Sequence, residues 1–370
     1  MRILHLGKFY PPTHGGVERV IAELVEGCNA VGLQTDVLCA SETLQSQTTT
    51  HRIGEMHYTI MRAASFGKLA RTAIAPMMIA RLHAMGSQYD VIHIHHPDPM
   101  AALALFLVRP KAKVVLQWHS DIVRQKRLLR FYAPLLQWLI RRADVVVGAT
   151  RAHIEDSDYT PHFAQKGRVI PYSITPLAPQ ENCIELDKRF FNVFALGRLV
   201  YYKGFEYLID AADALDESFR IFIGGDGALY QKLSAQIVRR NLQNRVFLLG
   251  ALSTQEICNY FEQCDVFVLP SIERTEMFGI VQLEAMGFGK PVVATKIERS
   301  GVHDVNVDMQ SGLIVPVCDS PALANALRTL KDDRALYAKL SCGAKQRIQA
   351  FLPENVISQW RALYQGLCEG

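Results

Sequence analysis

Residues 266–286 read Val266-Phe-Val-Leu-Pro270-Ser-Ile-Glu-Arg-Thr-Glu276-Met-Phe-Gly279-Ile-Val-Gln-Leu-Glu284-Ala-Met286. A short apolar run rich in β-branched and aromatic residues ends at Leu269, a polar loop follows, and a nearly apolar stretch begins at Gly279. This order predicts a buried strand, a loop and a helix.

The same succession repeats on both sides of this stretch. Buried strands are expected at 3–6, 35–39, 91–94, 113–118, 144–147 and 168–170, and again at 192–196, 220–223, 245–249, 266–269 and 291–294. Helical periodicity lies between many of them, as at 16–31, 71–85, 204–213 and 230–240. The alternation predicts parallel sheets with helices on both faces.

Residues 171–187 interrupt this rhythm with three prolines and no clear period, which is typical of a linker. We therefore predict an α/β protein with two Rossmann-like domains, 1–172 and 188–352, that face each other across a cleft. Ligands of open α/β sheets bind at the carboxyl ends of the strands, so the cleft is the expected place for chemistry.

Composition excludes several classes of protein. With 370 residues, 49% hydrophobic and 21% charged, the chain is globular and large enough for two domains. A net charge of +4 gives no reason to expect nucleic-acid binding. The eight cysteines form no C-x-x-C pair, which favours a reducing cytoplasm over a disulfide scaffold or zinc ribbon. No apolar run reaches the roughly 20 residues that cross a bilayer, and the N-terminus does not resemble a signal peptide.

Glu276 in the loop and Glu284 in the helix are the first candidate site residues. A buried carboxylate needs hydrogen-bonding partners, and sugar or ribose hydroxyls would supply them. The free amides at the start of the helix would hold a diphosphate. Taken alone, the two carboxylates would also fit a structural interpretation, with Glu276 as a helix cap or surface residue and Glu284 paired to another side chain of the protein.

Two glycine-bounded loops follow other predicted strands. Gly197-Arg198-Leu-Val-Tyr-Tyr-Lys203-Gly204 places two cations five residues apart, which suits a leaving diphosphate. Taken alone, the same two cations would also fit a solvated surface loop. Gly225, in Gly224-Gly-Asp-Gly227, ends the next strand with a tight turn.

In the N-terminal half, Gly15-Gly16 precedes the first helix, where Gly16 would let the backbone approach a phosphate or sugar. The stretch is not G-x-G-x-x-G, which argues against a plain dinucleotide site. His119 and Asp121 end another strand, where His119 would hydrogen-bond a sugar hydroxyl or help to orient an acceptor. A structural histidine with its hydrogen bonds satisfied inside the protein would fit the same position. The acceptor-side candidates are His14, Glu18, His95 and Asp121.

The run Ile92-His93-Ile-His95-His96 superficially suggests a metal site. Its histidines alternate along a strand and no matching set of carboxylates is present, so we expect no metal there.

Residues 109–142 hold nine Lys or Arg against one acid, Asp121. From Arg124 to Arg142 these cations alternate with Leu, Phe, Tyr and Trp, as in a surface that docks on anionic lipid. A core helix with a basic outer face would show the same pattern.

The stretch from Glu276 to Glu284 resembles the E-x7-E signature of GT4, a large family of retaining glycosyltransferases with the GT-B fold. Gly15-Gly16, Gly197-Arg198, Lys203-Gly204, Gly225-Asp-Gly227 and Lys290-Pro-Val-Val-Ala extend the resemblance over essentially the whole chain. Gly287-Phe-Gly289 departs from the alanine-rich turn of many members.

The resemblance implies a role for each matching residue. Arg198 and Lys203 would neutralise the leaving diphosphate, Glu276 would contact the donor sugar, and Glu284 would bind the ribose. His119 would lie beside the reacting sugar, and Gly16 would let the backbone come near the phosphates. The donor or phosphate oxygens would be held by the amides of Phe278, Gly279, Ile280 and Val281. The helix at 353–370, with Trp360, would cross back onto the first domain. Members generally need no catalytic metal or other cofactor.

We therefore expect a hexosyltransferase that uses a nucleotide-diphosphate sugar, with GDP-mannose or a related GDP-hexose favoured over a UDP-sugar. The favoured acceptor is a lipid-linked glycan of a bacterial surface polysaccharide, such as O-antigen or capsule, at the inner face of the cytoplasmic membrane. The alternatives are a UDP-sugar-dependent GT4 enzyme, a non-catalytic nucleotide-sugar-binding subunit, and a GT-B relative such as a sugar-nucleotide epimerase.

Overall fold

The computed structural model describes residues 1–13, 15–69, 72–122, 126–178, 181 and 184–369, without the side chains of residues 126, 127 and 164. The chain divides into two compact units. The first comprises Met1–Thr175 and Leu352–Gly370, and the second comprises Pro176–Phe351.

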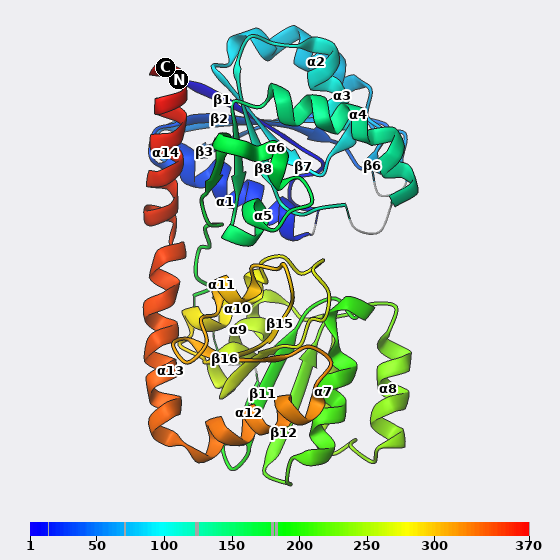
Figure 1. Ribbon diagram of the computed structural model, residues 1–370, viewed down its shortest axis with the longest axis vertical. Helices are drawn as coiled ribbons and strands as arrows, with labels where there is room; N and C mark the ends of the chain where they lie inside the picture. Colours follow the sequence, from blue (N-terminus) through cyan, green and yellow to red (C-terminus); the bar gives the residue numbers. More distant parts are fainter. Residues whose placement is uncertain (14, 70–71, 123–125, 179–180, 182–183, 370) are drawn as a thin grey trace. The chain divides into compact units, whose positions relative to one another are not determined.

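The first unit is built on an eight-stranded sheet in the order β10-β9-β8-β7-β1-β2-β4-β3 (Figure 1). All neighbours pair in parallel except β3, which runs antiparallel to β4 at the edge. The strands of the unit, including the separate β5–β6 hairpin, are β1 (Arg2–Gly7), β2 (Gln34–Ala40), β3 (Gln47–Ile53), β4 (Met56–Ala63), β5 (Lys68–Leu69), β6 (Thr72–Ala73), β7 (Val91–His96), β8 (Lys113–Trp118), β9 (Val145–Gly148) and β10 (Gly167–Val169).

Helices cover both faces of this sheet. They are α1 (Gly16–Ala30), α2 (Met77–Met85), α3 (Pro99–Val108), α4 (Lys126–Arg142), α5 (Arg151–Glu155), α6 (Thr160–Phe163) and α14 (Pro353–Glu369). Because side chains alternate along a strand, Leu4 and Leu6 of β1 pack in the cluster that includes residues of α2, α3 and α4. Ile3 points the other way, into a cluster with residues of α1 and α14.

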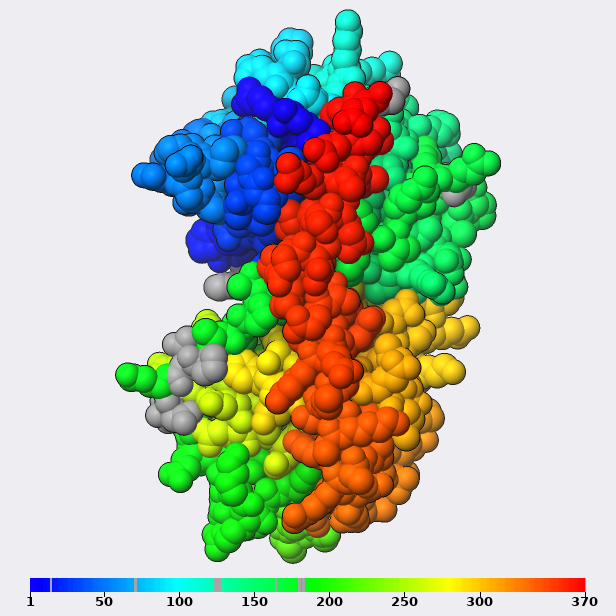
Figure 2. All heavy atoms as spheres, turned by 90° about the vertical axis from the view of Figure 1, so that its left-hand side faces the viewer, coloured from blue at the N-terminus to red at the C-terminus, as the bar shows by residue number. Residues whose placement is uncertain are grey.

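The C-terminal helix α14 belongs to the core of the first unit. Its Trp360 and Tyr364 are fully buried in the cluster with Ile3. Figure 2 shows α14 in red, lying between the blue N-terminal part of this unit and its green part.

The second unit has a six-stranded, all-parallel sheet in the order β13-β12-β11-β14-β15-β16. Its strands are β11 (Phe191–Leu196), β12 (Phe219–Gly224), β13 (Val246–Gly250), β14 (Val266–Leu269), β15 (Val292–Lys296) and β16 (Gly312–Pro316). Its helices are α7 (Phe205–Ala211), α8 (Tyr230–Arg239), α9 (Thr254–Gln263), α10 (Ile280–Gly287), α11 (Val302–Val305), α12 (Ser320–Asp332) and α13 (Arg334–Arg347). In chain order this is the 3-2-1-4-5-6 arrangement of a Rossmann fold.

Two doubly wound α/β units confirm the predicted fold class. The helix expected at 71–85 needs correction, because Thr72–Ala73 form β6 and α2 begins only at Met77. Within the described residues, no helix combines the length and apolarity that a membrane span requires.

Candidate active site

Two predicted loops of the second unit meet at the point where the strand order reverses. The strands β11 and β14 are sequence-distant neighbours in the sheet, with β12 on one side and β15 on the other. The loop with Arg198 and Lys203 leaves the carboxyl end of β11, and the loop with Glu276 leaves that of β14. Such a switch point is where doubly wound sheets bind ligands.

Backbone contacts join the two loops. The amide of Ile272 donates a hydrogen bond to the carbonyl of Tyr202 at 2.8 Å. Gly204 has a φ of +65°, and a Cβ there would lie 2.1 Å from the carbonyl oxygen of Pro270. Only glycine allows this close approach, which brings Lys203 up to the loop of Glu276.

Lys203 and Glu276 form an ion pair. Lys203 Nζ lies 2.5 Å from Glu276 Oε2, and the side chains are 11% and 12% exposed. Ser271 Oγ donates a second hydrogen bond to the same oxygen at 3.0 Å. Because an ammonium carries three N–H donors, Lys203 can hold Glu276 and still donate to an anionic ligand.

Arg198 lies on the surface of the same loop. It is exposed, and its Nη2 donates to the hydroxyl of Tyr202 at 3.3 Å. The adjacent Gly197 packs against the turn after β12, where Gly225 has a φ of +124° and a Cβ would lie 2.0 Å from the Gly197 carbonyl oxygen. Gly225 thus supports the Arg198 loop through its backbone.

The helix α10 begins beside this ion pair. Gly279 is its N-cap with a φ of +71°, and among the described residues no side-chain cap hydrogen bond is made there. Free amides and the helix dipole favour an anion at such an end. The residues Ile280 and Val281 in that turn are half-buried, and Phe278 is buried.

Glu284 lies further along α10 and is buried. Burial, and next the negative charge of Glu284, raise the pKa of the Cys258 thiol on α9. Glu284 thus lies within electrostatic range of the Cys258 thiol.

In the first unit, Gly16 is exposed at the start of α1. The carboxylate of Glu18 folds back over Gly15, since a Cβ on Gly15 would lie 2.0 Å from Glu18 Oε2. An anion at this helix terminus would therefore meet the charge of Glu18. His14 lies outside the described residues.

His119 and His95 are buried and hydrogen-bonded to each other. His95 Nδ1 lies 3.0 Å from His119 Nε2, and His119 Nδ1 lies 2.6 Å from Tyr172 Oη. Burial lowers the pKa of His119 to about 3, so its imidazole is neutral near pH 7.

Asp121 has a different set of contacts. Its Oδ1 accepts hydrogen bonds from Trp118 Nε1 at 2.9 Å and from Ser157 Oγ at 2.7 Å, and its Oδ2 accepts from the amide of Asp158 at 2.9 Å. These bonds tie the end of β8 to the segment before α6.

Three further residues contact the buried histidines of the first unit, and the sequence did not predict them as site residues. His5 Nδ1, on β1, lies 3.0 Å from His95 Nε2. Tyr364 Oη, on α14, lies 2.7 Å from His93 Nδ1. Tyr172 belongs to the irregular segment expected to be a linker. The available signal was the row of histidines at alternating positions on a buried strand.

His5, His93 and His95 bring one ring nitrogen each within 4.8 Å of one another, so these three could hold a metal ion. Both nitrogens of His95 already lie at hydrogen-bond distance from other imidazoles. A divalent cation held there by neutral ligands alone would also lack a compensating charge in a buried site. Hydrogen bonding therefore describes this cluster better than metal ligation.

The basic helix α4 combines a buried and an exposed apolar side. Leu136, Leu139 and Ile140 are buried in the core, whereas Leu128 is 50% and Phe131 is 86% exposed. Of the cations from the predicted basic segment, Arg124 lies outside the described residues, Arg130 and Arg141 are exposed, and Arg142 is paired with Asp144 at 3.2 Å.

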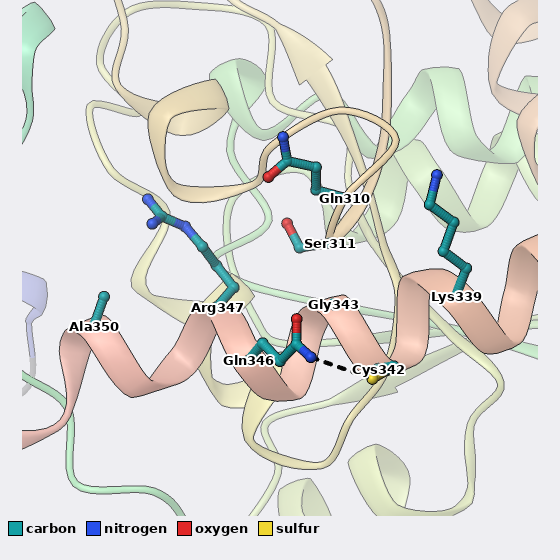
Figure 3. A pocket seen from close by; sticks show the side chains of 8 residues that line it. All are labelled: Gln310, Ser311, Lys339, Cys342, Gly343, Gln346, Arg347 and Ala350. Carbon is teal, nitrogen blue, oxygen red and sulfur yellow. Dashed lines mark hydrogen bonds between the residues drawn. The ribbon is translucent and has the colours of Figure 1, made fainter.

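A pocket of about 540 Å³ lies elsewhere in the second unit, between α13 and the loop before β16 (Figure 3). None of the predicted site residues lines it; its lining consists of Gln310, Ser311, Lys339, Cys342, Gly343, Gln346, Arg347 and Ala350. Arg347 is held in its wall by the carbonyls of Asp304 and Val305, at 2.6 and 3.0 Å.

Two family models match the chain. Residues 14–174 match the model described as Glycosyltransferase Family 4, and residues 181–347 match the model described as Glycosyl transferases group 1.

Curated relatives match over most or all of their length. The chain is 30% identical to O-antigen chain mannosyltransferase C of Escherichia coli, over 100% of this chain and 99% of that protein. It is 31% identical to D-rhamnosyltransferase WbpZ of Pseudomonas aeruginosa, over 89% and 86%. Among solved structures, HepE of Anabaena in complex with UDP shares the fold, with a TM-score of 0.77 and 22% identity over 99% and 100% of the two chains.

Proposed function

The chain belongs to the GT4 family of glycosyltransferases, and from this we propose the reaction that it catalyses. It is a retaining hexosyltransferase that moves a sugar of the mannose type from a GDP-sugar to a lipid-linked glycan. The product is part of a bacterial surface polysaccharide such as O-antigen. The names of the relatives support this choice, since one adds mannose to an O-antigen chain and another transfers D-rhamnose.

The ion pair between Lys203 and Glu276 carries the proposal. At 2.5 Å it places a cation for the leaving diphosphate next to a carboxylate for hydroxyls of the donor sugar. The uncapped first turn of α10 adds amide donors for phosphate oxygens, and the exposed Arg198 adds a second cation. Such an arrangement accelerates transfer by positioning the donor and by stabilising the charge that develops on the leaving group.

Other residues have supporting roles in this proposal. Glu284 holds the ribose, and Gly16 lets the backbone of the first unit approach the substrate. His119 hydrogen-bonds the reacting sugar. Arg198, Lys203 and the α10 amides supply the positive charge that a divalent metal provides in other transferases, so turnover continues in excess EDTA.

We propose further that α4 docks the enzyme on the inner face of the cytoplasmic membrane, where its acceptor is anchored. Exposed Leu128 and Phe131, next to exposed Arg130, offer both the apolar and the basic contacts that anionic lipid requires.

A thermal-unfolding panel with GDP, UDP, ADP and dTDP tests the donor site. We expect GDP alone to stabilise the protein, by about 2.7 kcal/mol at one hundred times its dissociation constant. Arg198→Ala should weaken this response, whereas Arg239→Ala, an exposed arginine on α8, should leave it unchanged.

Each other outcome of the panel has a definite meaning. Stabilisation by UDP alone would establish the UDP-dependent alternative, and no response to any nucleotide would refute the donor site. Binding without transfer to any of a range of lipid-linked acceptors would identify a non-catalytic subunit. Conversion of the donor sugar without an acceptor would identify an epimerase.

A further inference from the structure

Four buried histidines form a row on one face of the eight-stranded sheet. His5 of β1 pairs in register with His93 of β7, and His95 lies two residues further along β7 on the same face. His119 follows β8 directly, and all four imidazoles are at most 5% exposed.

Three of these imidazoles form a continuous hydrogen-bonded chain that ends at Tyr172. His5 Nδ1 lies 3.0 Å from His95 Nε2, His95 Nδ1 lies 3.0 Å from His119 Nε2, and His119 Nδ1 lies 2.6 Å from Tyr172 Oη. A neutral imidazole has one N–H and one lone pair. All hydrogen bonds of such a chain must therefore point in the same direction.

The chain is neutral near pH 7. Burial lowers the pKa of His5 and of His119 to about 3, and lowers that of His95 well below its ordinary value. The two histidines whose charge would act on His119 are neutral too, because burial lowers the pKa of His96 to about 3 and that of His153 to about 4.

The tyrosine sets the direction of the chain. Burial raises the pKa of Tyr172, so its hydroxyl keeps its proton. An imidazole nitrogen is a better acceptor than a phenol oxygen, and Tyr172 therefore donates to His119 Nδ1. His119 then carries its proton on Nε2 and donates it to His95, which in turn donates from Nε2 to His5.

We propose that Tyr172 and His95 hold His119 as the neutral Nε2–H tautomer, so that His119 serves the reaction as a hydrogen-bond donor and not as a general base. Its lone pair, on Nδ1, is covered by the Tyr172 hydroxyl. In the free enzyme His95 accepts the Nε2–H, so donation to a sugar oxygen requires the sugar to replace His95 as the acceptor. Tyr172 and His95 are positioning residues; this role of His119 toward substrate rests on the proposed function.

Long-range proton–nitrogen NMR of protein labelled with ¹⁵N-histidine tests the tautomer in the free enzyme. A His119→Asn variant assigns the His119 signals. We expect the Nε2–H pattern for His119 without titration from pH 5.5 to 8.5. Tyr172→Phe should produce a mixture of tautomers or the Nδ1–H form.

Tyr364→Phe is the matched control. Tyr364 is a buried tyrosine whose hydroxyl lies 2.7 Å from His93 Nδ1, so its loss should shift the signals of His93 and leave the His119 tautomer unchanged. A Nδ1–H form of His119 in the wild type, titration of His119 in this range, or an unchanged His119 tautomer in Tyr172→Phe would each overturn the inference.

The activity of the same variants separates this inference from the proposed function. Loss of the tautomer should lower kcat by about tenfold in Tyr172→Phe, with little change in KM for the donor. Sugar transfer with a Nδ1–H His119 would refute the inference and leave the function intact. A Nε2–H His119 in a protein without transferase activity would refute the proposed function and leave the tautomer inference intact.

Discussion

At the residue scale, Lys203 and Glu276 serve structure and chemistry at once. Their ion pair is nearly buried and links the loops after β11 and β14. In such a place each charge depends on the other, because an unpaired buried charge costs far more than an exposed one. Arg198 belongs to the same loop but is exposed, so its charge is available to a ligand without supporting the fold.

This contrast gives a prediction about substitutions. Lys203→Met should destabilise the protein by about 3 kcal/mol, since it leaves Glu276 buried without its cation. Arg198→Ala should change stability by less than about 0.5 kcal/mol. Both should lower turnover by roughly a hundredfold or more, as loss of a donor at developing charge does. Thermal unfolding and a sugar-transfer assay measure the two effects.

A double variant is the control for the ion pair. Combining Lys203→Met with Glu276→Gln removes both charges, and should recover part of the stability lost in Lys203→Met alone. Full activity of Arg198→Ala would remove it from the proposed mechanism. Equal stability of the single and double variants would show that the pair does not act through charge.

At the scale of helices and strands, the sequence predicted what is strongly periodic and buried. The strands β8 and β14 have the predicted limits, because each carries a buried apolar run that crosses the core, Val114–Leu116 in β8 and Val266–Leu269 in β14. The strand β3 was missed, since its residues are polar and mostly exposed and it pairs with β4 at the sheet edge.

The sequence predicted the residues of the candidate site that directly follow buried strands, and missed the one in an irregular segment. The loop residues Lys203 and Glu276 were found because both loops follow buried strands, and their pairing depends on the strand order that brings β11 beside β14. Tyr172 was missed because an irregular segment has no period, and only the folded chain brings its hydroxyl to His119.

The helix α4 gives a prediction that can be tested on vesicles. Replacing both Leu128 and Phe131 by Ser should reduce binding to vesicles that contain anionic lipid, because it removes exposed apolar contacts without opening the core. Val238→Ser, at a 54% exposed residue on α8, is the control and should bind as the wild type does. Co-sedimentation measures binding, and equal retention of all three proteins would exclude α4 as the docking surface.

At the scale of the whole molecule, the two units differ in their histidines. Among the described residues of the first unit, six histidines are buried: His5, His93, His95, His96, His119 and His153. The sequence of the second unit contains one histidine, His303. Burial lowers the pKa of all six below the ordinary 6.5, so they remain neutral in the folded unit.

This difference predicts that the first unit is the acid-sensitive one. Below pH 6.5 the unfolded chain binds protons that the folded unit does not, so stability falls as pH falls toward about 3 or 4. Each histidine contributes up to about 1.4 kcal/mol per pH unit in this range. Asp98 and Glu26 act in the opposite sense, because burial raises the pKa of Asp98 to about 6 and that of Glu26 above its ordinary value, but they are two carboxyl groups against six histidines.

Hydrogen exchange measured by mass spectrometry at pH 7.5 and 5.5, corrected for intrinsic exchange rates, separates the units within one sample. Strands β1, β7 and β8 should lose protection at pH 5.5, while β11, β12 and β14 keep theirs and serve as the internal control. Protonation of six histidines in the unfolded chain lowers the free energy of unfolding by several kcal/mol within one pH unit. This is a large part of the 5–15 kcal/mol that usually stabilises a folded protein. Equal loss of protection in both units would show that acid acts on groups other than this buried row, and retention in both would mean that the histidines are charged or hydrated in the folded state.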